Sequence, residues 1–133
     1  MLVVTALLAA CLVGAGSTSP TAADGNDAPG NPFAFRAIAG GAGHACTLVH
    51  DGTVKCWGEN AAGQLGIGST TDRGDGPGEM GNALPAVDLG TGRTATALAA
   101  GDNHTCALLD NATVKCWGSN DTGQLGLGNT ATR

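Results

Sequence analysis

Four cysteines are the residues of this chain whose spacing most clearly predicts chemistry. Cys46 and Cys56 stand ten positions apart, and Cys106 and Cys116 repeat that separation. Zinc sites usually draw cysteines from pairs separated by only two to four residues, so the wider spacing favours disulfides over metal ligation or free buried thiols. A disulfide closing so short a loop contributes about 2–3 kcal/mol to stability. We therefore predict two disulfides and no metal site.

Other side chains with chemical potential occur twice, at equivalent positions around each cysteine pair. A histidine precedes the first cysteine by two residues, a tryptophan follows the second cysteine directly, and a glutamine comes seven residues later. A catalytic group is seldom needed twice, so hydrogen bonding and packing within the fold are favoured over catalysis. The residues expected to hold the repeats together are His44, Trp57, Gln64, His104, Trp117 and Gln124.

Three carboxylates in a polar stretch offer the alternative of catalysis. Asp72, Asp75 and Glu79 could serve an exported hydrolase or lyase, but their spacing matches no known calcium loop. The sequence contains no recognisable nucleophile–base pair, phosphate-binding loop or paired-carboxylate motif. We therefore predict no catalytic residues and no cofactor, and interpret the chain as a non-enzyme.

The N-terminus predicts export. Residues 2–14 form an apolar run with the length of a signal-peptide core, although no Lys or Arg precedes it. Within it, Leu8-Ala9-Ala10-Cys11 resembles the lipobox of bacterial lipoproteins, in which the cysteine is acylated and becomes the mature N-terminus. The alternatives are ordinary cleavage after Thr21-Ala22-Ala23 or a retained apolar tail. We assign residues 1–11 to a lipobox-like signal segment with Cys11 as lipid anchor, and the polar, Gly/Pro-rich residues 12–35 to a flexible linker.

Composition limits the partners and the fold class. Six basic residues stand against eleven acidic ones, giving a net charge of −5 that repels phosphate backbones and argues against nucleic acid. Glycine occurs 23 times and tyrosine is absent, which suits short strands joined by tight turns better than helices.

The elements that must position the cysteines are strands of a repeated hairpin. Residues 37–73 recur as residues 97–133 with a constant offset of 60. Within the first copy, residues 44–49 and 53–57 alternate like strands around a three-residue turn that ends in Gly52, so Cys46 should face Cys56. The second turn has alanine at the equivalent position, which predicts either strain or a shift with Asn111 as the left-handed residue.

The repeated motif identifies a family resemblance. GxxHxCxL…TVKCWGxNxxGQLGxG resembles the regulator of chromosome condensation repeat, in the cysteine-bearing form typical of secreted bacterial proteins. The resemblance implies a seven-bladed β-propeller with one repeat per blade. Two repeats cannot close such a ring, so we interpret the chain as the N-terminal piece of a longer repeat protein.

These observations combine into one expectation. We predict an all-β fold of about two four-stranded antiparallel blades within residues 36–133, comprising repeats 36–95 and 96–133, the second incomplete. A strand predicted at residues 86–89 completes the strand count of the first blade. The expected function is an extracytoplasmic binding or scaffold module, either a cell-envelope lipoprotein or secreted, with a protein or glycan partner. Membrane contact is expected only through Cys11, and a metal-binding repeat remains an alternative alongside the exported enzyme.

Overall fold

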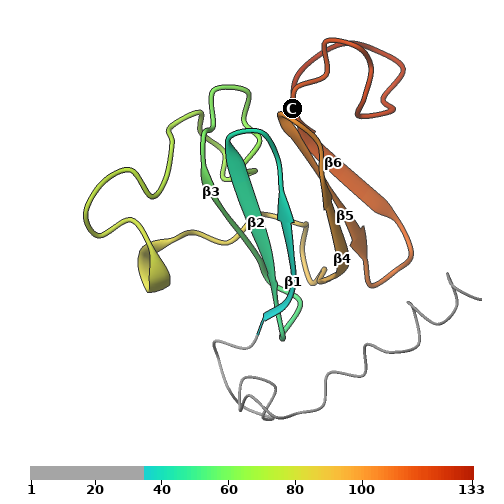
Figure 1. Ribbon diagram of the computed structural model, residues 1–133. Helices are drawn as coiled ribbons and strands as arrows, with labels where there is room; N and C mark the ends of the chain where they lie inside the picture. Colours follow the sequence, from blue (N-terminus) through green and yellow to red (C-terminus); the bar gives the residue numbers. More distant parts are fainter. Residues whose placement is uncertain (1–34) are drawn as a thin grey trace, which may run out of the picture.

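The computed structural model describes residues 35–133 and contains two three-stranded antiparallel sheets (Figure 1). The predicted signal segment with Cys11, and the linker up to residue 34, lie outside the described residues. No helix within 35–133 is long and apolar enough to cross a bilayer. The first sheet has the order β1 (Phe35–Gly40), β2 (His44–Val49) and β3 (Val54–Gly58), and the second has β4 (Ala95–Ala100), β5 (His104–Leu109) and β6 (Val114–Gly118). A short 3₁₀ helix, η1 (Gly81–Ala83), lies in the connection between them.

The hairpin register agrees with the prediction from the sequence. Cys46 lies opposite Cys56, and the amide of Val49 donates to the carbonyl of Thr53 at 2.8 Å. Hydrogen-bonded and non-hydrogen-bonded pairs alternate along an antiparallel ladder, so the cysteines, three steps from that bond, form a non-hydrogen-bonded pair. Such pairs bring Cα atoms closest together, and the two cysteine Cα atoms are 4.0 Å apart.

The two hairpin turns are the same despite their different sequences. Gly52 ends the first turn with φ of 85°, as predicted. Ala112 ends the second turn with φ of 64°, so the suggestion that Asn111 would take the left-handed conformation is wrong. The ladder explains the outcome, because Leu109 and Thr113 keep the same bond at 2.8 Å, and this register leaves the left-handed position to Ala112.

Each sheet has three strands, where four were expected. Residues 86–89 contribute only an isolated bridge between Ala86 and Lys55, supported by a 2.8 Å bond from the Val87 amide to the Val54 carbonyl. Pro85 has no N–H to continue the ladder, which limits pairing at this edge. The alternation within the segment still holds, because Val87 and Leu89 are buried.

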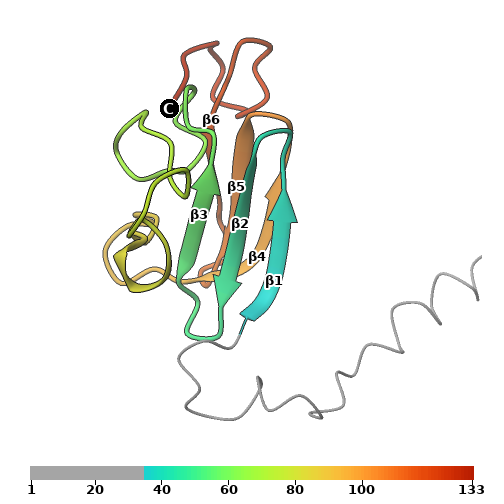
Figure 2. The same cartoon turned by 60° about the vertical axis from the view of Figure 1, so that its left-hand side comes forward.

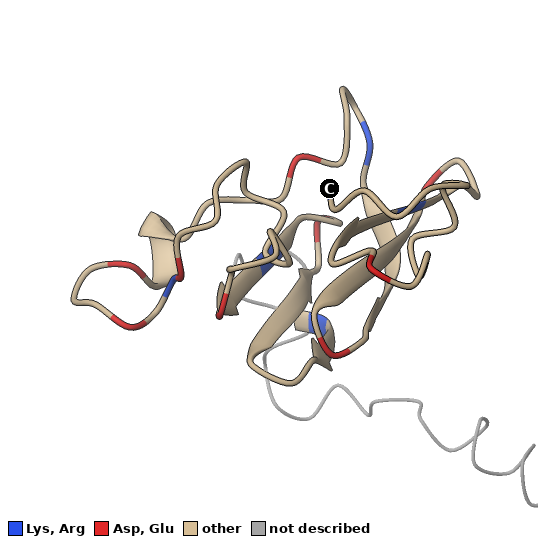
Figure 3. Ribbon diagram, turned by 90° about the horizontal axis from the view of Figure 1, so that it is seen from above, with Lys and Arg blue, Asp and Glu red and all other residues tan. Residues whose placement is uncertain are grey.

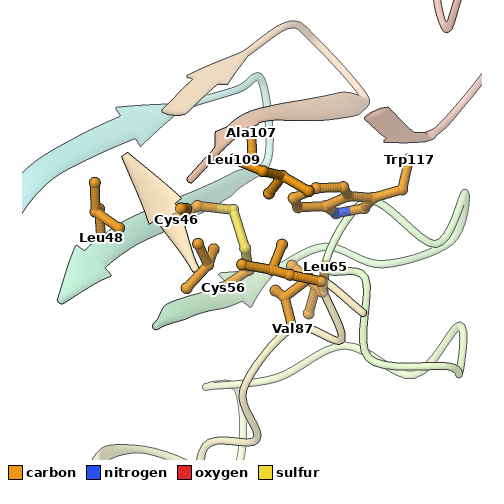
Figure 4. Packing of buried hydrophobic residues seen from close by; sticks show 11 residues of the cluster. Cys46, Leu48, Cys56, Leu65, Val87, Ala107, Leu109 and Trp117 are labelled. Carbon is orange, nitrogen blue, oxygen red and sulfur yellow. A yellow bond between two sulfur atoms is a disulfide. The ribbon is translucent and has the colours of Figure 1, made fainter. Parts of the chain in front are cut away.

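The two sheets pack face to face, with β4 in contact with β1 and β2 (Figure 2). We call the side of each sheet that carries the cysteines the back face and the opposite side the front face. The back face of the first sheet packs on the front face of the second, and Figure 4 shows the first disulfide beside the indole of Trp117. The buried cluster consists of Cys46, Leu48, Val54, Cys56, Leu65, Val87, Leu89, Ala95, Ala107, Leu109 and Trp117.

Charged residues are arranged around this core rather than across it. Every Asp and Glu of residues 35–133 lies outside the strands, in turns and connections (Figure 3). Lys55 and Lys115, at equivalent positions on β3 and β6, reach backbone carbonyls of the connection, at Gly81 and Asp88 respectively. The loops therefore present the polar surface, and the strands provide the scaffold.

Candidate functional site

A buried polar cluster joins the two repeats. The indole N–H of Trp117 donates to the backbone carbonyl of Gln64 at 2.9 Å, and the hydroxyl of Thr105 donates to the same oxygen at 3.0 Å. Nε2 of His44 lies 2.9 Å from that hydroxyl oxygen. Three of the predicted structural residues, His44, Gln64 and Trp117, thus meet at one point between the sheets. Thr105 was not among the predicted residues, because only contact with the other sheet gives its hydroxyl a role.

The geometry fixes the state of the His44 ring. The single hydroxyl hydrogen of Thr105 goes to the backbone carbonyl of Gln64, so the His44 ring donates from Nε2 to the hydroxyl oxygen. Within residues 35–133, Nδ1 of His44 is buried without a hydrogen bond. Burial lowers the pKa of His44, and the nearby His104 lowers it further. A lowered pKa favours the neutral ring, which donates a structural hydrogen bond across the junction.

Close packing around Trp117 explains a glycine of the GQLG motif. A Cβ atom on Gly66 would lie 2.6 Å from Nε1 of Trp117, which is too close for any side chain. At the equivalent position of the second repeat, a Cβ on Gly126 would meet nothing within 4 Å. The same motif residue is thus sterically required in one repeat and free of neighbours in the other.

Trp57, His104 and Gln124, which lie 60 positions from Trp117, His44 and Gln64, do not form a second cluster. Trp57 is half-buried on the front face of the first sheet, and His104 is half-buried on the back face of the second. Gln124, also half-buried, accepts from the Thr122 amide with its side-chain oxygen at 2.9 Å, as Gln64 does from Ala62. The local roles of these residues are repeated, but the polar cluster forms only once within residues 35–133.

Two asparagines that the sequence reasoning did not select organise the loops after β3 and β6. Asn60 and Asn120 are fully buried. Each side-chain oxygen accepts from the leucine amide five residues later, at 3.0 and 2.9 Å, and each side-chain amide donates to two loop carbonyls. Their shared position, three residues after the tryptophan, is the signal that could have identified them. Asn120 also begins an N-x-Thr sequon, but its burial leaves it unavailable for glycosylation.

All four framework cysteines are engaged in disulfides. Cys46 bonds to Cys56 and Cys106 to Cys116, with Cα atoms 4.0 and 4.1 Å apart. The first disulfide lies wholly inside the cluster, whereas the second is half-buried. Within residues 35–133, no group of three or more His, Cys, Asp or Glu side chains is arranged to hold a metal ion. The thiolates that a metal-binding repeat would use are oxidised in this structure.

Two of the loop carboxylates accept hydrogen bonds from nearby backbone amides. Asp72 accepts from the Asn60 amide at 2.7 Å, and Glu79 accepts from the amides of Gly74 and Gly76 at 2.9 and 3.0 Å. The N–H groups of Gly76 and Gly74 lower the pKa of Glu79, and Arg73 forms an ion pair with it at 3.6 Å. The exposed carboxylate of Asp75 is on the same loop. The arrangement is that of an ordered surface loop, in which two of the three carboxylates already have backbone partners.

A groove of about 730 Å³ lies on the front face of the first sheet. Its floor is formed by β2 and β3, with Val49 and Trp57, and Ile38 and Met80 are exposed at its sides. This surface corresponds by position to the front face that is buried in the second sheet.

Sequence comparisons give the chain a family context. Two profiles described as regulator of chromosome condensation (RCC1) repeat match it, one at residues 35–64 and 95–124 and the other at residues 51–108. A curated RCC2 homolog from Danio rerio is 38% identical over 89 residues, which cover 66% of this chain and 16% of that protein. The ultraviolet-B receptor UVR8 from Arabidopsis thaliana is 32% identical over 100 residues, covering 74% and 21% respectively.

Two solved structures share the fold of this chain. Human WBSCR16 superposes with a TM-score of 0.54 at 23% identity, covering 75% of this chain and 25% of that one. Prp20p from Saccharomyces cerevisiae, described with its binding to Gsp1p and histones, gives 0.52 at 25% identity, covering 72% and 22%. The chain therefore spans about a fifth or less of the length of the two curated relatives, and about a quarter or less of the two structures.

Proposed function

Because the chain belongs to the RCC1 repeat family and its two sheets are blades of a β-propeller, we propose that it acts as a non-catalytic binding or scaffold module in an extracytoplasmic compartment. Its partner in this proposal is a protein or a glycan, contacted through the loops of the blades. Nucleic acid is a poor partner for a chain with a net charge of −5.

The proposal rests on one observation: the side chains of the repeated motif are engaged in holding the fold together. The histidine, glutamine, asparagine and cysteine side chains of the first repeat hold turns, the hairpin and the junction between blades, and Trp117 of the second repeat completes that junction. The connection at residues 74–84 is largely exposed and is available for recognition. Glu79 bonds to two of its amides, so this loop is ordered before any partner arrives, which lowers the entropic cost of binding.

A protein partner is the first expectation for this loop. The structural relative Prp20p is described with binding to Gsp1p and histones, and propeller loops are common recognition surfaces. Fold alone does not define a partner, so the proposal depends on the loop itself.

The test compares a loop replacement with a matched control. Residues 74–78 are replaced by a Gly-Ser segment of equal length, and the control replaces exposed residues 110–112 of the opposite hairpin turn in the same way. The oxidised chain is assayed on a glycan array and by crosslinking to extracytoplasmic proteins. We expect loop replacement alone to abolish the specific signal. Equal binding by both variants, or substrate turnover lost on changing Asp72, Asp75 and Glu79 to Ala, would contradict the proposal.

The compartment is a separate part of the proposal. Two disulfides are compatible with an oxidising, extracytoplasmic location, and disulfides are rare in reducing cytosol. Alkylating free thiols in intact cells before mass spectrometry should find the four framework cysteines protected, and a diacylglyceryl adduct on Cys11 would identify a lipoprotein. Labelling of all four framework cysteines would contradict export.

A further inference from the structure

Three sequons for N-linked glycosylation lie in the second repeat, and the fold places them in different surroundings. Asn103-His104-Thr105, Asn111-Ala112-Thr113 and Asn120-Asp121-Thr122 each match the acceptor pattern N-x-Thr. The pattern requires an asparagine and a hydroxyl side chain, so a folded acceptor must expose both of them. The burial of these side chains therefore decides which sequon is usable.

Two of the sequons are not accessible in the folded chain. Asn120 is fully buried, and its side-chain amide donates to two loop carbonyls at 2.8 and 3.0 Å. Asn103 is exposed, but Thr105 is fully buried and its hydroxyl donates to the backbone carbonyl of Gln64. Neither sequon combines a free amide nitrogen with an accessible hydroxyl.

The sequon in the turn between β5 and β6 is accessible at both positions. Asn111 and Thr113 are exposed. The hydroxyl of Thr113 donates to Oδ1 of Asn111 at 2.7 Å, and the amide of Thr113 donates to the same oxygen at 3.2 Å. Within residues 35–133, Nδ2 of Asn111 makes no hydrogen bond. The turn therefore holds this side chain by its oxygen and leaves the nitrogen free to react.

The turn of the first repeat shows that a following blade leaves this position at the surface. Asp51 is the equivalent of Asn111, and the second blade lies directly beside its turn, since the Ala95 amide donates to the Gly52 carbonyl at 2.8 Å. Gly52 is buried there and Thr53 is half-buried, yet Asp51 remains exposed. A blade beside the second turn would therefore also leave Asn111 exposed.

We propose that Asn111 is a site of N-linked glycosylation, with a polyprenyl-pyrophosphate-linked oligosaccharide as the donor. Nδ2 of Asn111 attacks C1 of the first sugar, the bond between C1 and the pyrophosphate oxygen breaks, and the lipid pyrophosphate leaves with the electron pair. A base of the oligosaccharyltransferase takes the proton that Nδ2 loses. The proposal rests on the extracytoplasmic location proposed above, because N-linked glycans are attached to exported chains.

The experiment offers the folded, oxidised 133-residue chain to a purified single-subunit oligosaccharyltransferase that requires only N-x-Thr, together with its lipid-linked donor. Intact mass measures transfer, and peptide mapping locates it. Circular dichroism and intact mass establish that each variant is folded with both disulfides, and a synthetic peptide of residues 109–115 is the positive control for the enzyme. The assay involves neither the binding partner nor the cell, so its failure is distinct from failure of the proposed function.

We expect a glycan on Asn111 of the folded chain. Asn111→Gln and Thr113→Ala lose it, whereas Thr113→Ser, which keeps a hydroxyl group, retains it. A folded chain that stays unmodified while the peptide is glycosylated would overturn the proposal. Transfer to Asn103 or Asn120 of the folded chain would also overturn it, because burial would then not select the acceptor.

A matched variant tests the turn that has a blade beside it. Asp51→Asn creates the N-x-Thr pattern in the first turn, and the amide oxygen can replace the carboxylate oxygen that accepts from the Thr53 amide at 2.8 Å. We expect this variant to carry a second glycan, at position 51. Transfer to Asn111 without transfer to position 51 would show that a neighbouring blade closes the turn to the enzyme, and this result would overturn the proposal.

Discussion

The first and second repeats carry nearly the same hairpin in different surroundings. Both have the same register and a disulfide at the same place, yet the Cys46–Cys56 disulfide lies inside the core and the Cys106–Cys116 disulfide lies on an open face. The local sequence therefore specifies the hairpin, whereas the neighbouring blade decides how much each residue contributes to stability. Equivalent substitutions in the two repeats should separate these two contributions.

The largest difference is expected on removing the disulfides. Cys46→Ala with Cys56→Ala should lower the free energy of unfolding by about 5 kcal/mol, since it loses both the cross-link and buried packing. Cys106→Ala with Cys116→Ala should cost about 3 kcal/mol, mostly through the cross-link. Urea denaturation measures both, and equal losses would show that the surroundings of the two disulfides do not matter.

The glycines of the GQLG motif give the next largest contrast. Both Gly66 and Gly126 have positive φ, so alanine should cost about 1 kcal/mol at either position. Gly66→Ala should cost at least about 2 kcal/mol more, because its Cβ would lie 2.6 Å from Nε1 of Trp117. Thermal or urea unfolding of the two variants provides the comparison. A smaller loss for Gly66→Ala than for Gly126→Ala would contradict the placement of Trp117.

The buried histidine makes stability depend on pH. Because burial lowers the pKa of His44, the unfolded chain binds a proton more readily than the folded chain below about pH 6.5. The contribution of neutral His44 to stability is therefore fully present above that pH. On acidification this group lowers the free energy of unfolding by at most about 1.4 kcal/mol per pH unit. We expect His44→Gln to remove this part of the slope in unfolding experiments between pH 7 and 5. An unchanged slope would contradict a neutral, buried His44.

The smallest effect is a gain of stability at the second turn. Ala112→Gly should raise the free energy of unfolding by about 0.5–1 kcal/mol, because glycine adopts a φ of 64° without steric cost. The reciprocal change Gly52→Ala should destabilise by more than this, since its Cβ would approach the Cβ of Thr94 to 2.5 Å. Loss of stability in Ala112→Gly would show that the turn is not strained.

Local patterns predicted the hairpin but not its dependence on neighbours. The ten-residue spacing and the turn sequence were sufficient for the register of Cys46 and Cys56, because hairpin pairing involves residues close in sequence. The same local reasoning left two alternatives for the second turn, strain at Ala112 or a shift to Asn111, and it placed a strand at residues 86–89. The ladder overrides the preference of Asn111, and Pro85 limits the pairing of that segment.

The polar cluster was beyond sequence reasoning for a different reason. His44, Gln64 and Trp117 were recognised as structural residues, but their meeting with Thr105 joins positions up to 61 residues apart. Such a contact depends on how one blade is rotated against the next, which no local pattern encodes. Asn60 and Asn120 could have been found, since their repetition follows the same offset as the cysteines.

The central claim, that the blades join through this buried cluster, is tested most directly by a double-mutant cycle between His44 and Thr105. His44→Ala, Thr105→Val and the double variant are unfolded in urea, and the coupling energy is taken from the four free energies of unfolding. A direct bond at 2.9 Å predicts a coupling of about 1 kcal/mol, with the double variant losing less than the sum of the single losses. Strictly additive losses would contradict the junction described for these two blades.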